Sequence, residues 1–227
     1  MEPVTRSDAS LGKRARAATS SEEQELTRKL LNCGIVAGPI YLALGIGQGV
    51  MREGFDFSRH ALSLLANGSG GWIQTANFAV TGALVVAAAM GLSRALATKP
   101  RLAWWLLGAY GLAVFLAAFF RADPVDGFPP GTPEGIPASI STTGLLHFAV
   151  GALGFAMLGL SCLAASRSLA RKGMRALSRL SLVSGLVVLA GFFGGMTPSI
   201  GIAGIWVAVV AGWLWLSVVS YTVRARA

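Results

Sequence analysis

Four side chains from separate segments have the chemistry of metal ligands. The only two histidines among the 227 residues are His60 and His147. Asp123 and Asp126 add two carboxylates, and imidazole and carboxylate groups are common ligands of catalytic zinc. A divalent metal ion held by these four residues could activate water against a lipid-linked ester. A metal-assisted membrane hydrolase is therefore one hypothesis, although spacing in the sequence does not show that the four residues converge.

Two arginines and two amides form a second set, suited to holding a polar ligand. Arg59 and Arg121 could bind a phosphate or carboxylate through charge-assisted hydrogen bonds. Gln74 and Asn77 recur at helical spacing and so share one helix face. Because buried polar groups in a bilayer usually face the protein interior or a wet cavity, they indicate a polar pocket. The candidate ligand-binding residues are Arg59, His60, Gln74, Asn77, Arg121, Asp123, Asp126 and His147.

Several of these residues also have a purely structural interpretation. His147 could be a hydrogen-bonding residue near a helix end, and Asp123, which precedes a proline, could cap a turn. Gln74 and Asn77 could only bond neighbouring helices. Arg121 could extend toward phosphate headgroups. The cluster as a whole therefore argues for a site more strongly than any one of its members.

Motifs of the common soluble enzymes are absent. The sequence has no P-loop, no dinucleotide fingerprint, no Cys-x-x-Cys pair, no His-Glu-x-x-His and no Gly-x-Ser-x-Gly. No charged residue lies near the middle of a predicted span, where ion-coupled transporters usually have one. This absence argues against the third hypothesis, a small-solute transporter. The leading hypothesis is an accessory membrane protein whose outward pocket binds a lipid headgroup or small ligand.

Composition places the candidate residues in a membrane protein. Hydrophobic residues make up 54% of the chain and charged residues only 13%, against about 25% charged in soluble domains. Since a spanning helix needs roughly 20 apolar residues, the pattern predicts an all-α bundle of six transmembrane helices within residues 20–223. The expected helices are residues 30–50, 72–96, 102–120, 144–169, 177–196 and 200–223.

Basic residues set the expected orientation. Of the 19 Lys and Arg residues, 16 fall on one side of the six predicted spans, and only Arg52, Arg59 and Arg121 fall on the other. The side rich in basic residues normally faces the cytoplasm, so both termini are expected there and the candidate site outside, in the plasma membrane. The charge is spread over separate edges without a binding motif, which excludes nucleic acid as a partner and favours contact with the lipid bilayer.

The chain ends, the prolines and the small residues carry further predictions. Residues 1–19 are polar and are expected to be disordered, with a helix starting at the capping box that begins at Ser20, and residues 224–227 form a cytoplasmic tail. Five of the nine prolines lie in residues 121–143, which predicts an ordered lid over the helix ends. Small residues at Gly204, Ala208 and Gly212 indicate close helix packing, either within one bundle or in a homodimer.

Four segments resemble one known family. They are GFDFSRHALSLL at 54–65, GWIQTANF at 71–78, DPVDGFPPGTP at 123–133 and GLLHF at 144–148. Together they resemble the bacterial membrane family catalogued as domain of unknown function 998 (DUF998), over roughly residues 30–222. The proline-rich segment is the most specific part of the resemblance.

The resemblance implies a small bacterial polytopic membrane domain and no established activity. Its signature segments coincide with the outer loops and outer helix ends that carry the candidate site. The family in turn resembles six-helix eukaryotic membrane proteins linked to lipid handling, which favours a lipid over a solute. No cofactor is evident, and a divalent metal ion is expected only under the hydrolase hypothesis.

Overall fold

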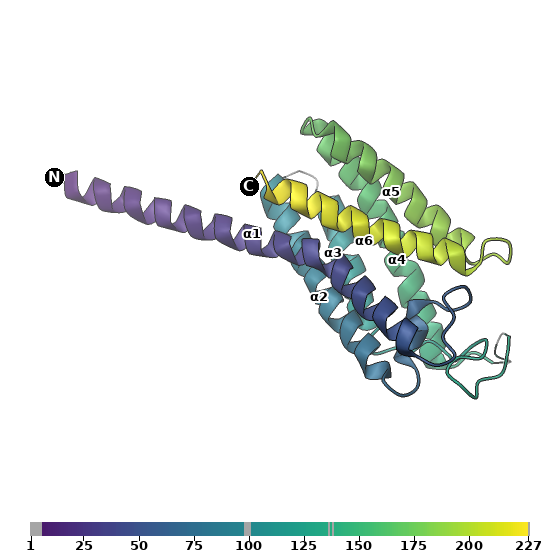
Figure 1. Ribbon diagram of the computed structural model, residues 1–227. Coiled ribbons are helices and arrows are strands. Elements are labelled where there is room, and N and C mark those ends of the chain that lie inside the picture. Colours follow the sequence, from purple (N-terminus) through teal and green to yellow (C-terminus); the bar gives the residue numbers. More distant parts are fainter. Residues whose placement is uncertain (1–5, 98–100, 136, 138, 227) are drawn as a thin grey trace.

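The computed structural model describes residues 6–97, 101–135, 137 and 139–226, and these residues are almost entirely helical (Figure 1). Their regular elements are six α-helices and one short 3-10 helix, η1, with no extended strand. In chain order they are α1 (Arg6–Met51), η1 (Leu62–Ala66), α2 (Gly71–Leu96), α3 (Leu102–Leu116), α4 (Thr142–Arg171), α5 (Arg175–Gly194) and α6 (Ile202–Arg224).

Five of the helices are long and apolar enough to cross a bilayer, which makes the chain a multi-pass helical membrane protein. The exception is α3, which has 15 residues and ends at Leu116, four residues before the predicted end at residue 120. Beyond it, Ala118 and Phe119 donate to the carbonyls three residues earlier, Phe115 and Leu116. The apolar stretch thus continues as tight turns after the α-helix has ended.

The first helix begins earlier than the sequence predicted. It starts at Arg6, so residues 6–19 are helical where disorder was expected, and the capping box at Ser20 does not begin a helix. Residues 1–5 lie outside the described residues. The segment 6–19 is rich in Ala and Arg, which are strong helix formers. This part of α1 projects away from the other helices (Figure 1).

The helices form a closed ring. Each packs against its neighbour in sequence, and α6 returns to pack against α1. Glycines allow the closest approaches: a Cβ atom on Gly82 of α2 would lie 2.5 Å from the backbone nitrogen of Phe115. On α6, a Cβ on Gly204 would lie 2.5 Å from the carbonyl oxygen of Gly191 in α5. The small residues of α6 are therefore used for packing inside one bundle.

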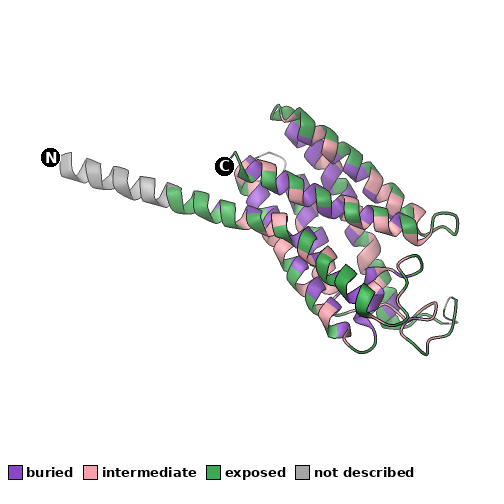
Figure 2. Cartoon of the chain, in the orientation of Figure 1, coloured by how far each residue is buried: buried purple, intermediate pink, exposed green. Residues whose placement is uncertain are grey.

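Exposed side chains around the ring are largely apolar, as expected for contact with lipid (Figure 2). At one end of the ring lie the segments 52–70, 117–141 and 195–201, which connect the helices there (Figure 1). We call this the loop end. All eight candidate ligand-binding residues lie in these connections or in the helical turns next to them.

Candidate functional site

An ion-pair network joins the two long connections of the loop end. The guanidinium of Arg59 donates from Nε and Nη2 to the carboxylate of Asp126, at 3.0 and 2.7 Å. Its Nη2 also pairs with Glu134. The bonds from Arg59, with a further one from the backbone N–H of Gly135, lower the pKa of Asp126 to about 2. The charge of Arg59 is thereby already matched by two carboxylates.

His60 stands beside this network, and both its ring nitrogens are in use. Nδ1 accepts a hydrogen bond from the backbone N–H of Asp56 at 3.0 Å. Nε2 must then carry the proton, and it donates to the backbone carbonyl of Asp126 at 3.0 Å. The ring is 1% exposed and contacts the rings of Phe55 and Phe128. His60 thus holds the two connections together and has no free nitrogen for a metal ion. We refer to Arg59, His60, Asp126 and Glu134 as the loop clasp.

Asp123 fixes the start of α4. Its carboxylate accepts from the backbone N–H of Ser141 at 2.9 Å and from the Ser141 hydroxyl at 2.5 Å. Ser141 Oγ in turn accepts from the backbone N–H of Gly144, which makes Ser141 the N-cap. A negative charge is favourable at a helix N-terminus, so this geometry accounts for Asp123 without a ligand.

The two amides of α2 lie in its contact with α1. Asn77 Nδ2 donates to the Tyr41 carbonyl at 3.1 Å and to Gln74 Oε1 at 3.2 Å. The carbonyl of Tyr41 can only accept, so this bond fixes the orientation of the Asn77 amide. Gln74 and Asn77 are 0% and 1% exposed. Both serve helix association, and neither lines the cavity described below.

The predicted cluster of His60, Arg121, Asp123 and His147 does not form a contact network. His147 donates from Nδ1 to the Phe120 carbonyl at 2.8 Å, and Arg121 is exposed without a hydrogen bond or ion pair to any described residue. Within the described part of the chain, no three His, Cys, Asp or Glu side chains are grouped to hold a metal ion. The four-ligand arrangement of the hydrolase hypothesis is therefore not assembled.

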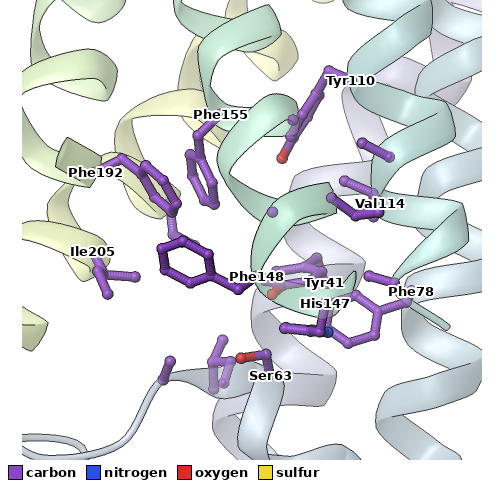
Figure 3. Close-up of a pocket in the computed structure, with 18 of the residues that line it drawn as sticks. Tyr41, Ser63, Phe78, Tyr110, Val114, His147, Phe148, Phe155, Phe192 and Ile205 are labelled. Atoms are coloured by element: carbon purple, nitrogen blue, oxygen red, sulfur yellow. The ribbon is translucent and has the colours of Figure 1, made fainter. Parts of the chain in front are cut away.

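A cavity of about 190 Å³ lies inside the ring, and all six α-helices and η1 contribute to its wall (Figure 3). His147 is the one candidate residue that lines it. Most of the wall is aromatic or aliphatic, where the sequence had predicted a polar pocket. The aromatic residues of the wall are Tyr41, Phe78, Tyr110, Phe148, Phe155, Phe192, Trp206 and Trp213.

Ring contacts hold these aromatic side chains in place. Phe155 of α4 stacks on Phe192 of α5 with ring centroids 4.2 Å apart. Trp213 of α6 contacts Tyr41 of α1 and Tyr110 of α3, at 4.9 and 6.0 Å between centroids. The first two contacts join neighbouring helices, and the contact between Trp213 and Tyr110 joins α6 to α3 across the ring. The wall is thus preformed by aromatic packing.

The cavity wall reaches the surface at the loop end. Phe148 of α4 and Met196 beyond α5 both line the cavity, yet they are 52% and 41% exposed. Apart from Gly144, the buried residues of α4 begin only at Gly154. The first three turns of α4 are therefore poorly covered, and Phe148 in them lines the cavity together with residues of α5 and α6. The cavity therefore has an apolar opening that borders the exposed apolar surface of the ring.

Comparison with known proteins assigns the family. The family described as "Protein of unknown function (DUF998)" matches residues 35–222. The chain belongs to this family. No curated protein and no solved structure matches it. All residues that line the cavity, from Tyr41 to Trp213, lie inside the matched range, so the cavity is part of the DUF998 domain itself.

Sequence reasoning missed most of the cavity of this DUF998 protein. Tyr41, Tyr110, Phe155 and Trp213 are far from the predicted membrane surfaces, where aromatic residues commonly act as anchors. Their position in the middle of spans was a usable signal for an internal aromatic site. Trp72 and Trp105 are 72% and 76% exposed, as anchors would be.

Proposed function

We propose that this DUF998 protein binds the apolar part of a membrane amphiphile in its central cavity. The observation that carries the proposal is a preformed, mostly apolar cavity whose wall reaches the lipid-facing surface at Phe148 and Met196. Ligand sites are typically apolar hollows with few polar groups. A water-soluble ligand would have little to bind in such a wall.

The volume indicates which part of a ligand fits. An engineered cavity of about 150 Å³ holds one benzene molecule, and drug-sized ligands occupy roughly 300–1,000 Å³. A cavity of about 190 Å³ therefore accepts one ring or a short chain segment. The rest of a larger amphiphile would extend through the opening into the bilayer.

The proposal includes an orientation. The loop end faces the outside of a bacterial plasma membrane, and both termini lie in the cytoplasm. Helix α3 with its following turns also crosses the membrane, which brings the number of spans to six. The 16-to-3 distribution of basic residues supports this arrangement. The cavity then opens toward the outer leaflet, and lipid reaches it sideways from the bilayer.

Photolabelling in liposomes tests the binding. The probe is decane with a diazirine at one end, a hydrocarbon without a head group. We expect label on the cavity-lining peptides of α4, α5 and α6, and we expect excess unlabelled decane to compete for it.

Two matched glycine variants control the experiment. At Gly151, which lines the cavity, an added Cβ meets nothing within 4 Å, so Gly151→Phe fills the space without a backbone clash. Gly47 is equally open but lies exposed on α1, outside the cavity wall. Gly151→Phe should lose most of the saturable label, and Gly47→Phe should keep it. Equal labelling of the two variants would show that the probe reports only surrounding lipid.

A further inference from the structure

The polar groups of the cavity wall indicate the chemistry of the ligand's head. Resting on the proposed function, we infer that the site selects an uncharged head group carrying an oxygen acceptor, such as an alcohol or a ketone, and discriminates against anionic heads. The inference rests on one unpaired donor, on two neutral polar groups in the same wall and on the absence of charge among the described residues that line it.

The unpaired donor is Trp206. Its Nε1 atom is buried and has no hydrogen-bond partner in the described part of the chain, and the residue lines the cavity. An indole N–H can only donate, and a buried donor without a partner is unfavourable. A ligand oxygen in the cavity would supply the missing acceptor.

Two further polar groups of the cavity wall, those of His147 and Ser63, lie at the loop end. His147 donates from Nδ1 to Phe120, which leaves Nε2 of the neutral ring as an acceptor. The hydroxyl of Ser63, in η1, also lines the cavity and has no hydrogen bond to a described residue. Figure 3 shows Ser63 and His147 at the same edge of the cavity. A hydroxyl group both donates and accepts, so it could bond to a donor or to an acceptor of this wall, whereas a ketone can only accept.

Among the residues that the structure describes, no charged side chain lines the cavity. The arginines of the loop end do not compensate for this. Arg59 is paired with Asp126 and Glu134, and Arg52 donates to the carbonyls of Leu65 and Asn67. A phosphate or carboxylate head in the cavity would be a buried charge without a partner, which is strongly unfavourable. This argues against the earlier hypothesis that Arg59 binds a phosphate there.

A competition series with one chain length tests the inference. Decan-1-ol, decan-2-one, decanoate and decyl phosphate are compared with decane as competitors of the photoreactive decane, at equal mole fraction in the bilayer and at pH 9, where decanoate is ionised. We expect the alcohol and the ketone to compete about five- to tenfold better than decane, the size of one net hydrogen bond. Decanoate and decyl phosphate should compete no better than decane.

Variants connect the preference to the proposed donor. Trp206→Phe keeps an aromatic ring and should remove the preference for the ketone while decane still competes. Ser63→Ala gives a second, milder test with the alcohol. Trp72→Phe, at an exposed tryptophan outside the cavity wall, should change nothing.

The outcomes separate the two proposals. Decyl phosphate competing as well as the alcohol, or a ketone preference that survives Trp206→Phe, would overturn the inference while saturable decane labelling still upheld the cavity. Loss of saturable labelling by decane itself would overturn the proposed function and, with it, the inference.

Discussion

The guanidinium of Arg59 holds the carboxylate of Asp126 through two hydrogen bonds across 67 residues of sequence. Two parallel hydrogen bonds between a guanidinium and a carboxylate fix the relative orientation of the two groups as well as the distance between them. Through it, the connection between α1 and α2 is tied to the proline-rich connection between α3 and α4. The same contact removes Arg59 from the set of free cations that a ligand could use.

Replacing the guanidinium of Arg59 by the single ammonium of a lysine should loosen the proline-rich connection. A lysine cannot reproduce the two-point contact of Arg59. We expect Arg59→Lys to be cut several-fold faster between residues 121 and 141 in limited proteolysis of the folded protein. Arg121→Lys is the control, because Arg121 is exposed and has no bond to a described residue. If both variants resist the protease as well as the unaltered protein does, the clasp does not order the connection.

The clasp should also depend on pH in a defined direction. Its contacts lower the pKa of Asp126 to about 2, below the value of about 3.9 for an unfolded aspartate. The stabilisation is therefore fully present above about pH 4 and is lost as the pH falls toward 2. Hydrogen exchange of residues 126–135, corrected for intrinsic rates, should show protection that is constant from pH 7 to 4 and falls below it. Protection that already declines between pH 7 and 5 would assign the effect to another group, and Asp126→Asn should lack the transition below pH 4.

His60 should matter for stability. His60→Ala leaves the N–H of Asp56 and the carbonyl of Asp126 without their partner, and both of the lost hydrogen bonds are partly buried. We expect a loss of about 1–3 kcal/mol, seen as a lower Tm in detergent. The hydrolase hypothesis instead predicts loss of bound metal at unchanged stability. A His60→Ala protein with an unaltered Tm would contradict the role of His60 in the clasp.

Fusions to alkaline phosphatase test the orientation. The enzyme should be active when fused after Ala66 or Ser139, and inactive when fused after Lys172, because it folds only outside the cytoplasm. The reversed pattern at any of these positions would require the loop end to face inward.

Most of the fold could be predicted, because the bilayer fixes the length of an apolar helix. Helix α2 begins one residue before its predicted start and ends at the predicted residue, and α4 extends two residues beyond its predicted limits at each end. The end of α3 could not be seen, since residues 117–120 stay apolar after the chain has left the α-helix. The start of α1 was misjudged because polar composition was given more weight than helix propensity.

The site was harder to predict, since its contacts depend on how the ring closes. The sequence indicated that the candidate site residues gather at one end, but not that Arg59 would be matched by Asp126. Nor could it show that Tyr41, Tyr110 and Trp213, on three different helices, surround one space. Local periodicity carries no information about such contacts.

Native mass spectrometry of the protein extracted in its own membrane lipid tests the central claim most directly. Collisional activation first removes the surrounding lipid. The unaltered protein and Gly47→Phe should each retain a bound, largely apolar molecule, and Gly151→Phe should retain none. If the unaltered protein is bare, or if all three retain the same molecules in equal amount, the cavity does not bind a membrane amphiphile.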